Sequence, residues 1–119
     1  MVQRCLAGLL PAVTAAYALA TLAATSAQAD AVAYLVNVTV RPGYNFPNAD
    51  AALAYGHGIC NKVASGRGYA DLISDVKADF TTSDEYQAVY LINQAVNELC
   101  PALIWQLRNS AVRYRPSDP

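Results

Sequence analysis

Histidine and cysteine, on which many catalytic and metal sites depend, are scarce in this sequence. Its 119 residues include one histidine and three cysteines. A metal site normally needs several His, Cys or carboxylate ligands together, and nucleophilic catalysis needs a nucleophile beside a base. No phosphate-binding loop, dinucleotide fingerprint, zincin or kinase motif occurs. We therefore expect no enzymatic activity, no metal and no cofactor.

Charge is also sparse. Only 14% of the residues are charged, and the net charge is −1. The sequence has neither the basic stripe of a nucleic-acid-binding protein nor the amphipathic basic helix of a protein that binds anionic membranes. A nucleic-acid partner is therefore not expected. Charge points to no other partner, which leaves another secreted or cell-envelope protein as the open possibility.

The N-terminal segment has the features of an export signal. Met1–Arg4 is positively charged, residues 5–26 are uncharged, and Ala27-Gln28-Ala29 has the small-x-small form of a cleavage site. A retained membrane anchor is the alternative, because about 20 apolar residues can span a bilayer. Alanine, threonine and Pro11 weaken that alternative. We predict a cleaved signal peptide over residues 1–29, secretion or cell-envelope localisation, and no stable membrane anchor afterwards.

The expected mature protein keeps two cysteines, Cys60 and Cys100. An even number of cysteines in an exported chain is typical of a disulfide bond. A domain of this size buries a limited share of its surface, so a covalent link between distant segments contributes much of its stability. Both cysteines lie on apolar helical stripes. We therefore predict a Cys60–Cys100 disulfide that joins two helices.

Hydrophobic periodicity predicts an all-α domain over residues 30–112, a small bundle of about four helices followed by a disordered tail at 113–119. Residues 30–40 are ambiguous: their valines favour a strand, but the apolar positions share a helical face, so a helix is preferred. The later signals are Asn48 as a helix cap, Gly56 as a site of close helix approach, an amphipathic helix over 69–80, Thr82 and Glu85 as a capping box, and Pro101 as a break after Leu99.

Two short motifs resemble a known family. Gly56-His57-x-x-Cys60 and Leu99-Cys100-Pro101, within a chain of helical pattern, are similar to the small secreted mycobacterial proteins grouped as domain of unknown function 732. The resemblance extends from Asp30 to about Leu107. It implies an exported, disulfide-linked, all-α domain. It implies no reaction.

Four residues are candidates for a ligand site. Tyr55 adjoins His57, and Tyr86 and Tyr90 lie one helical turn apart, so together they could line a pocket for a lipid or haem. Residues of this kind at helical spacing also occur in ordinary cores, and Asp71, Asp75 and Asp79 have the spacing of a solvated helix edge. We expect a non-enzymatic binding or structural module, and the alternative is a carrier of a small hydrophobic ligand between helices.

Overall fold

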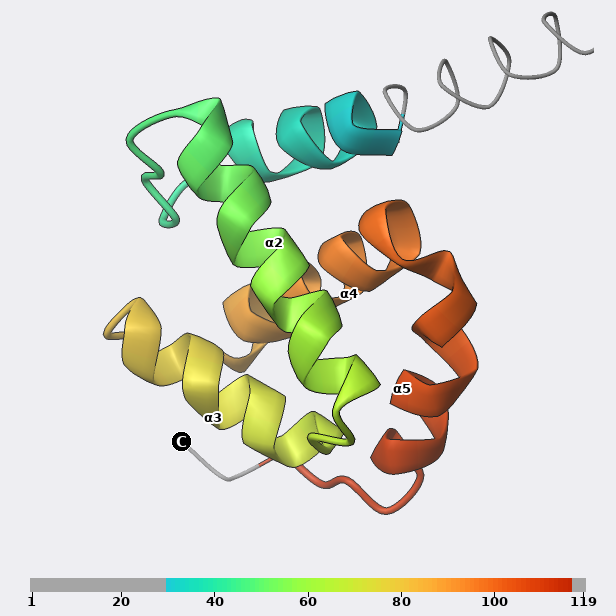
Figure 1. Cartoon of the computed structure of the whole chain (residues 1–119). Coiled ribbons are helices and arrows are strands. Elements are labelled where there is room, and N and C mark those ends of the chain that lie inside the picture. Colours follow the sequence, from blue (N-terminus) through green and yellow to red (C-terminus); the bar gives the residue numbers. More distant parts are fainter. Residues whose placement is uncertain (1–29, 117–119) are drawn as a thin grey trace, which may run out of the picture. The chain divides into compact units, whose positions relative to one another are not determined.

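The computed structural model describes residues 30–116, so the predicted signal peptide and residues 117–119 lie outside the described residues. The chain divides into two units at Asp30, and the second unit, which begins at Ala31, forms the helical domain. All regular structure in residues 30–116 is helical, which confirms the all-α prediction (Figure 1). The helices are residues 30–39, α2 (Ala49–Ala64), α3 (Tyr69–Asp79), α4 (Glu85–Leu99) and α5 (Ile104–Ala111), with a 3-10 turn at Pro101–Leu103.

Residues 30–39 form a helix, as preferred over a strand. Tyr34 and Val38 lie one turn apart on its buried face, and both are almost fully buried. The hydroxyl of Tyr34 donates a hydrogen bond of 2.9 Å to the carbonyl of Ala52 in α2. This helical spacing lets two large side chains enter the core together, which decides the conformation against the strand propensity of the valines.

Helix α4 is the central element of the domain. It packs against both α2 and α3, and in Figure 1 α2 crosses in front of it. Its inward side chains are completely buried because neighbouring helices cover them on two sides. The residues at 0% exposure are Ala88, Leu91, Ile92, Ala95 and Val96.

The predicted disulfide joins Cys60 in α2 to Cys100 at the end of α4, with 6.1 Å between the two Cα atoms. Gly56 lies one turn before Cys60 and is buried. A Cβ atom on Gly56 would lie 2.6 Å from a methyl carbon of Leu99 and 2.7 Å from the ring of Tyr34. The close approach predicted at Gly56 is therefore present, and the side chains of Leu99 and Tyr34 are the groups that approach it.

The capping-box prediction for α4 is wrong. Asp84 caps the helix, and its carboxylate accepts hydrogen bonds from the backbone N–H groups of Tyr86 and Gln87. Thr82 lies two residues before this cap, and its hydroxyl oxygen accepts from the backbone N–H of Asp84 at 3.1 Å. Its own backbone N–H, which a capping box would direct to Glu85, donates to the carbonyl of Lys77 at the end of α3. The short connection between α3 and α4 supplies hydrogen bonds to both helix ends. Its first residues donate to the last carbonyls of α3, and Asp84 caps α4.

Pro101 interrupts the last helical pattern, as predicted. Helix α4 ends at Leu99, and the chain passes through a 3-10 turn before α5 begins at Ile104. The break makes α5 a separate helix, so the described residues form five helices and not about four. Tyr114, within the predicted disordered tail, departs from that prediction: its ring packs edge-on against Tyr69 with 5.1 Å between centroids.

Candidate functional site

A groove of about 480 Å³ lies where the helix of residues 30–39 connects to α2. We call it the loop groove. It is open to solvent along the connecting segment, and three parts of the chain form its walls. The first helix supplies Leu35, Val38 and Thr39; the connection supplies Arg41, Pro42, Asn45 and Phe46; the start of α2 supplies Asn48, Ala49 and Ala52.

Arg41 is the one charged residue of the loop groove. Its guanidinium lies over the ring of Tyr90, 4.3 Å from the centroid. Arg41 takes part in none of the three ion pairs found among residues 30–116. A cation held against an aromatic face but not neutralised by a carboxylate keeps its capacity to bind an anion. The groove thus combines a largely apolar wall with a single positive group at its edge.

Local sequence explains this geometry. The connection contains Pro42 and Gly43, and Gly43 has a φ of +111° that favours glycine. Asn45 also adopts a positive φ, which asparagine tolerates better than most residues. The two positions reverse the chain sharply, while the side chain of Asn48 caps α2 by accepting from the N–H of Ala51 at 2.8 Å. The first helix and α2 are thereby held apart by a short, shaped connection.

The four residues predicted to line a ligand pocket do not come together. His57 is exposed, and Tyr86 is 78% exposed. Tyr90 is half-buried and donates a hydrogen bond of 3.1 Å to the carbonyl of Asn37. Tyr55 faces the end of α3 instead, where its hydroxyl bonds to Asp79. Two of the four reach the loop groove from behind, Tyr90 through Arg41 and Tyr55 through Phe46, but they do not line a common pocket, so the site as predicted is not formed.

Tyr55 belongs to an aromatic cluster with Tyr44, Phe46 and Phe80. Its hydroxyl donates to the carboxylate of Asp79 at 2.8 Å. Burial, together with this hydrogen bond to an anion, raises the pKa of Tyr55 well above its ordinary value. Phe46 also lines the loop groove. The cluster therefore supports one wall of the groove, and Tyr55 stays neutral there at physiological pH.

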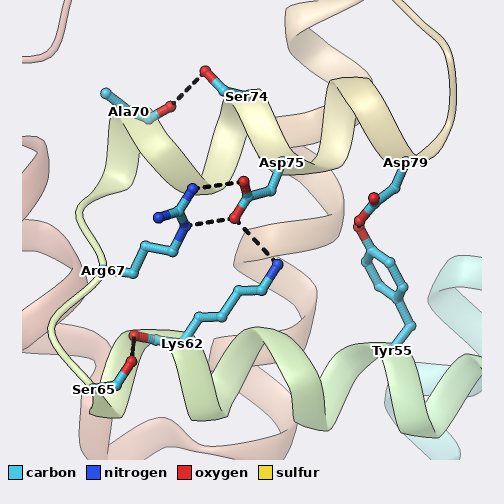
Figure 2. Close-up of polar contacts among 8 residues, drawn as sticks. All are labelled: Tyr55, Lys62, Ser65, Arg67, Ala70, Ser74, Asp75 and Asp79. Carbon is cyan, nitrogen blue, oxygen red and sulfur yellow. Dashed lines mark hydrogen bonds and ion pairs between the residues drawn. The ribbon is translucent and has the colours of Figure 1, made fainter.

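Between α2 and α3 the polar contacts are structural (Figure 2). Asp75 receives Arg67 through two hydrogen bonds of 2.5 and 2.7 Å and Lys62 through one of 3.1 Å. These bonds, that of Arg67 above all, hold the pKa of the Asp75 carboxyl below its usual range. Asp71, Asp75 and Asp79 were predicted to form a solvated helix edge. Asp75 and Asp79 instead bond to side chains of α2 and of the segment after it. Within residues 30–116, the Asp71 side chain forms no such bond.

No group of His, Cys, Asp and Glu within residues 30–116 has the arrangement of a metal site. In the same residues, no buried side-chain nitrogen or oxygen lacks a hydrogen-bond partner. None of the helices described over this range is both long and apolar enough to cross a bilayer.

The residues that carry this chemistry match a known family. The family described as "Protein of unknown function (DUF732)" matches residues 27–102. The chain belongs to this family. No curated protein and no solved structure was found to match it. The match confirms the resemblance drawn from the Gly-His and Leu-Cys-Pro motifs, and it covers the loop groove and the disulfide while stopping before α5.

Sequence reasoning missed Arg41 and Phe46 as members of a site in this DUF732 domain. The connection that carries them, residues 41–48, contains two prolines, a glycine and two asparagines, which identify it as a loop. An arginine and two aromatic residues in one short loop could have indicated a binding site, because binding residues often lie on loops that a rigid scaffold positions. Helical periodicity predicts which side chains share a helix face and says nothing about the side chains of a loop.

Proposed function

We propose that this DUF732 protein is an exported, non-enzymatic binding module, and that the loop groove is its binding site. The observation that carries the proposal is the groove of about 480 Å³ with its single cation, Arg41. Pockets of roughly 300–1,000 Å³, lined mainly by apolar groups with a few placed polar ones, are typical of small-molecule sites. Export is supported by the sequence of residues 1–29 and by the disulfide, which is typical of an oxidising compartment.

The lining of the groove supports one class of ligand. Leu35, Val38 and Phe46 offer contact to an apolar body, and Arg41 offers a charge-assisted hydrogen bond to an acceptor or anionic group. A small amphiphile with an apolar chain and a negative head fits both requirements. This is the carrier function expected as the alternative, at a different place from Tyr55, His57, Tyr86 and Tyr90.

The binding test compares two probes of the same chain length and opposite charge, decanoate and decyltrimethylammonium, by isothermal titration calorimetry. We expect decanoate to bind and the cationic probe to bind more weakly. Ala49 lines the groove and is exposed, so Ala49→Trp fills the groove without entering the core. Ala54→Trp is the matched control, at an exposed position of α2 that does not line the groove. Equal decanoate binding by both variants would show that the groove is not the site.

Export has its own test, which is mass spectrometry of the natively produced protein. We expect an N-terminus at Asp30, a mass lower by two hydrogens because of the disulfide, and a bound amphiphile that survives gentle ionisation. A retained N-terminus on membranes contradicts the proposed localisation. A spectrum without bound ligand, together with no measurable heat of decanoate binding, contradicts the carrier function but does not bear on export.

A second candidate function is the binding of another secreted or envelope protein. It is favoured by three valines spaced four residues apart, Val32 and Val36 in the first helix and Val40 directly after it, which are 57%, 54% and 75% exposed. A stripe of this spacing is typical of a helix that packs against a partner. A photo-crosslinking residue at position 36 of the exported protein should capture one discrete protein, and the same residue at Ser74 on α3 should not. Equal capture from both positions contradicts this second candidate.

A further inference from the structure

Helix α5 and the turn directly after it present a group of exposed side chains, which we call the α5 face: Trp105 and Arg108 in the helix, and Val112 and Arg113 after its end. Leu107 is the buried residue of this helix, and Trp105 and Val112 lie away from it, two turns apart. Trp105 is 71% exposed and Val112 is 78% exposed. Two large apolar side chains thus project into solvent, one from this short helix and one from just after its end. In Figure 1, α5 lies at the edge of the domain, beside the C-terminal end of α2.

Charge is segregated along the chain in the same place. Residues 104–116 contain three arginines and no acidic residue, whereas residues 30–103 contain four basic and eight acidic residues. The three arginines, Arg108, Arg113 and Arg115, are all exposed. The guanidinium of Arg108 lies 5.5 Å from the centroid of the Trp105 ring, which brings a cation to the edge of the apolar patch. Residues 104–116 are therefore basic, whereas the rest of the described domain is acidic.

The scaffold holds the α5 face in a fixed orientation. The amide of Gln106, the residue after Trp105, donates to the carbonyl of Val63 at 2.6 Å. The hydroxyl of Ser110 accepts from the backbone N–H of Tyr69 at 3.1 Å. With Leu107 in the core, these contacts fix α5 to the end of α2 and the start of α3. The exposed tryptophan is thus presented by a helix with specific anchors.

The geometry points to an anionic lipid surface as the partner of the α5 face. We propose that the domain docks on such a surface peripherally, with Trp105 and Val112 at the level of the lipid headgroups and the arginines against lipid phosphates. Tryptophan is enriched at membrane–water interfaces, and arginine near an anionic surface adds electrostatic attraction. A stable protein interface buries roughly 800 Å² on each side and involves about 20–30 residues. Four side chains are well short of that, but they match what an interfacial helix uses.

This inference goes beyond the loop groove and does not depend on it, because the two sites share no residue. It also revises the sequence-based expectation that no helix has a basic amphipathic face. Trp105 and Leu107 are two positions apart, so a helix places them on nearly opposite sides, and the structure buries the leucine and exposes the tryptophan. Docking of this kind is reversible and needs no segment that crosses the bilayer.

The chain provides its own probe for the test, because Trp105 is its one tryptophan. The full chain is produced through an export pathway and its N-terminus is read by mass spectrometry. Trp emission is then recorded with phosphatidylcholine vesicles and with vesicles that also contain phosphatidylglycerol. We expect a blue shift and quenching by brominated lipid with the anionic vesicles, both reversed by high salt. Unshifted emission, or an equal shift with both vesicle types, overturns the proposal.

Two double variants localise the effect. Arg108→Gln/Arg113→Gln removes two charges from the α5 face, and Lys62→Gln/Arg67→Gln removes two at the edge between α2 and α3, outside both proposed sites, so both variants have the same net charge. We expect the first to weaken partition to anionic vesicles roughly thirty-fold and the second to change it less than about two-fold. Circular dichroism melts verify that both variants fold. Equal loss in the two overturns the site, and so does emission that shifts with soluble polyglutamate but not with vesicles, which would indicate an acidic protein partner.

Discussion

The two sides of α2 are held to the domain by different interactions. Toward α4, the contact is apolar and covalent: the Cys60–Cys100 disulfide is flanked by Gly56, which admits Leu99 of α4 and also the ring of Tyr34 from the first helix. Toward the outer edge of α3, the contacts are polar and partly exposed, and they centre on Asp75. Burial and covalent linkage stabilise a fold under most conditions, whereas exposed ion pairs contribute little and respond to salt and pH. Stability should therefore be concentrated on the α4 side.

Reducing the disulfide should cause the largest loss. The bond closes a loop between residues 40 positions apart, and the chain-entropy estimate for such a loop is about 3.9 kcal/mol. Typical domains have a total unfolding free energy of about 5–15 kcal/mol, so reduction should lower the melting temperature by many degrees. Thermal melts with and without reductant, and of Cys60→Ser/Cys100→Ser, measure it. An unchanged melt would show that apolar packing alone holds α2 to α4.

Two glycines of α2 test the apolar part of the same contact. Gly56→Ala places a methyl group within 3 Å of both Leu99 and Tyr34, and overpacking of this kind destabilises by about 1–3 kcal/mol. Gly58→Ala, two residues on, meets no atom within 4 Å and should stabilise by about 0.5–1 kcal/mol through helix propensity. Chemical denaturation of the pair separates packing from propensity. Shifts of the same sign would contradict the close approach at Gly56.

The sequence predicts the α4 side of α2 better than the α3 side, for a physical reason. Apolar periodicity and the cysteine count report burial, so Gly56, Cys60 and Cys100 could be assigned before the structure was known. The bonds of Asp75 and Asp79 depend on which long side chains reach them across a helix pair, and no sequence period encodes that. The same limit hid the loop groove, because Arg41 and Phe46 lie in a connection whose shape is set by Gly43 and Asn45.

The end of α3 shows the limit of local motifs in another way. Thr82 and Glu85 have the spacing of a capping box, but the helix begins later. Glu85 instead pairs with Lys77 at 2.5 Å and receives the hydroxyl of Tyr114. Burial works against the charged form of Glu85, yet these two hydrogen bonds outweigh it and lower the pKa of its carboxyl. A long-range pair thus takes the carboxylate that the local motif would use.

The polar side of α2 should yield the smallest effect, and one that depends on pH. Hydrogen bonds from Arg67 and Lys62 lower the pKa of Asp75 from its ordinary value of 3.8, so the carboxylate favours the folded state. Its contribution is fully present above that ordinary value and is lost as the pH falls through the lower pKa of the folded state. Asp75→Asn should therefore reduce the melting temperature slightly at neutral pH, less than Gly56→Ala does, and the difference from the unmodified protein should shrink in acid and in high salt.

Glu98→Gln is the matched control for Asp75→Asn, because it also neutralises one carboxylate and Glu98 takes part in none of the ion pairs within residues 30–116. Its melting temperature should follow that of the unmodified protein at every pH. The decisive measurement is the pH dependence of the difference between the two variants. If Asp75→Asn destabilises as much as reduction of the disulfide, or by the same amount at pH 3 and pH 7, the polar edge is a principal support of the fold and the asymmetry between the two sides of α2 is wrong.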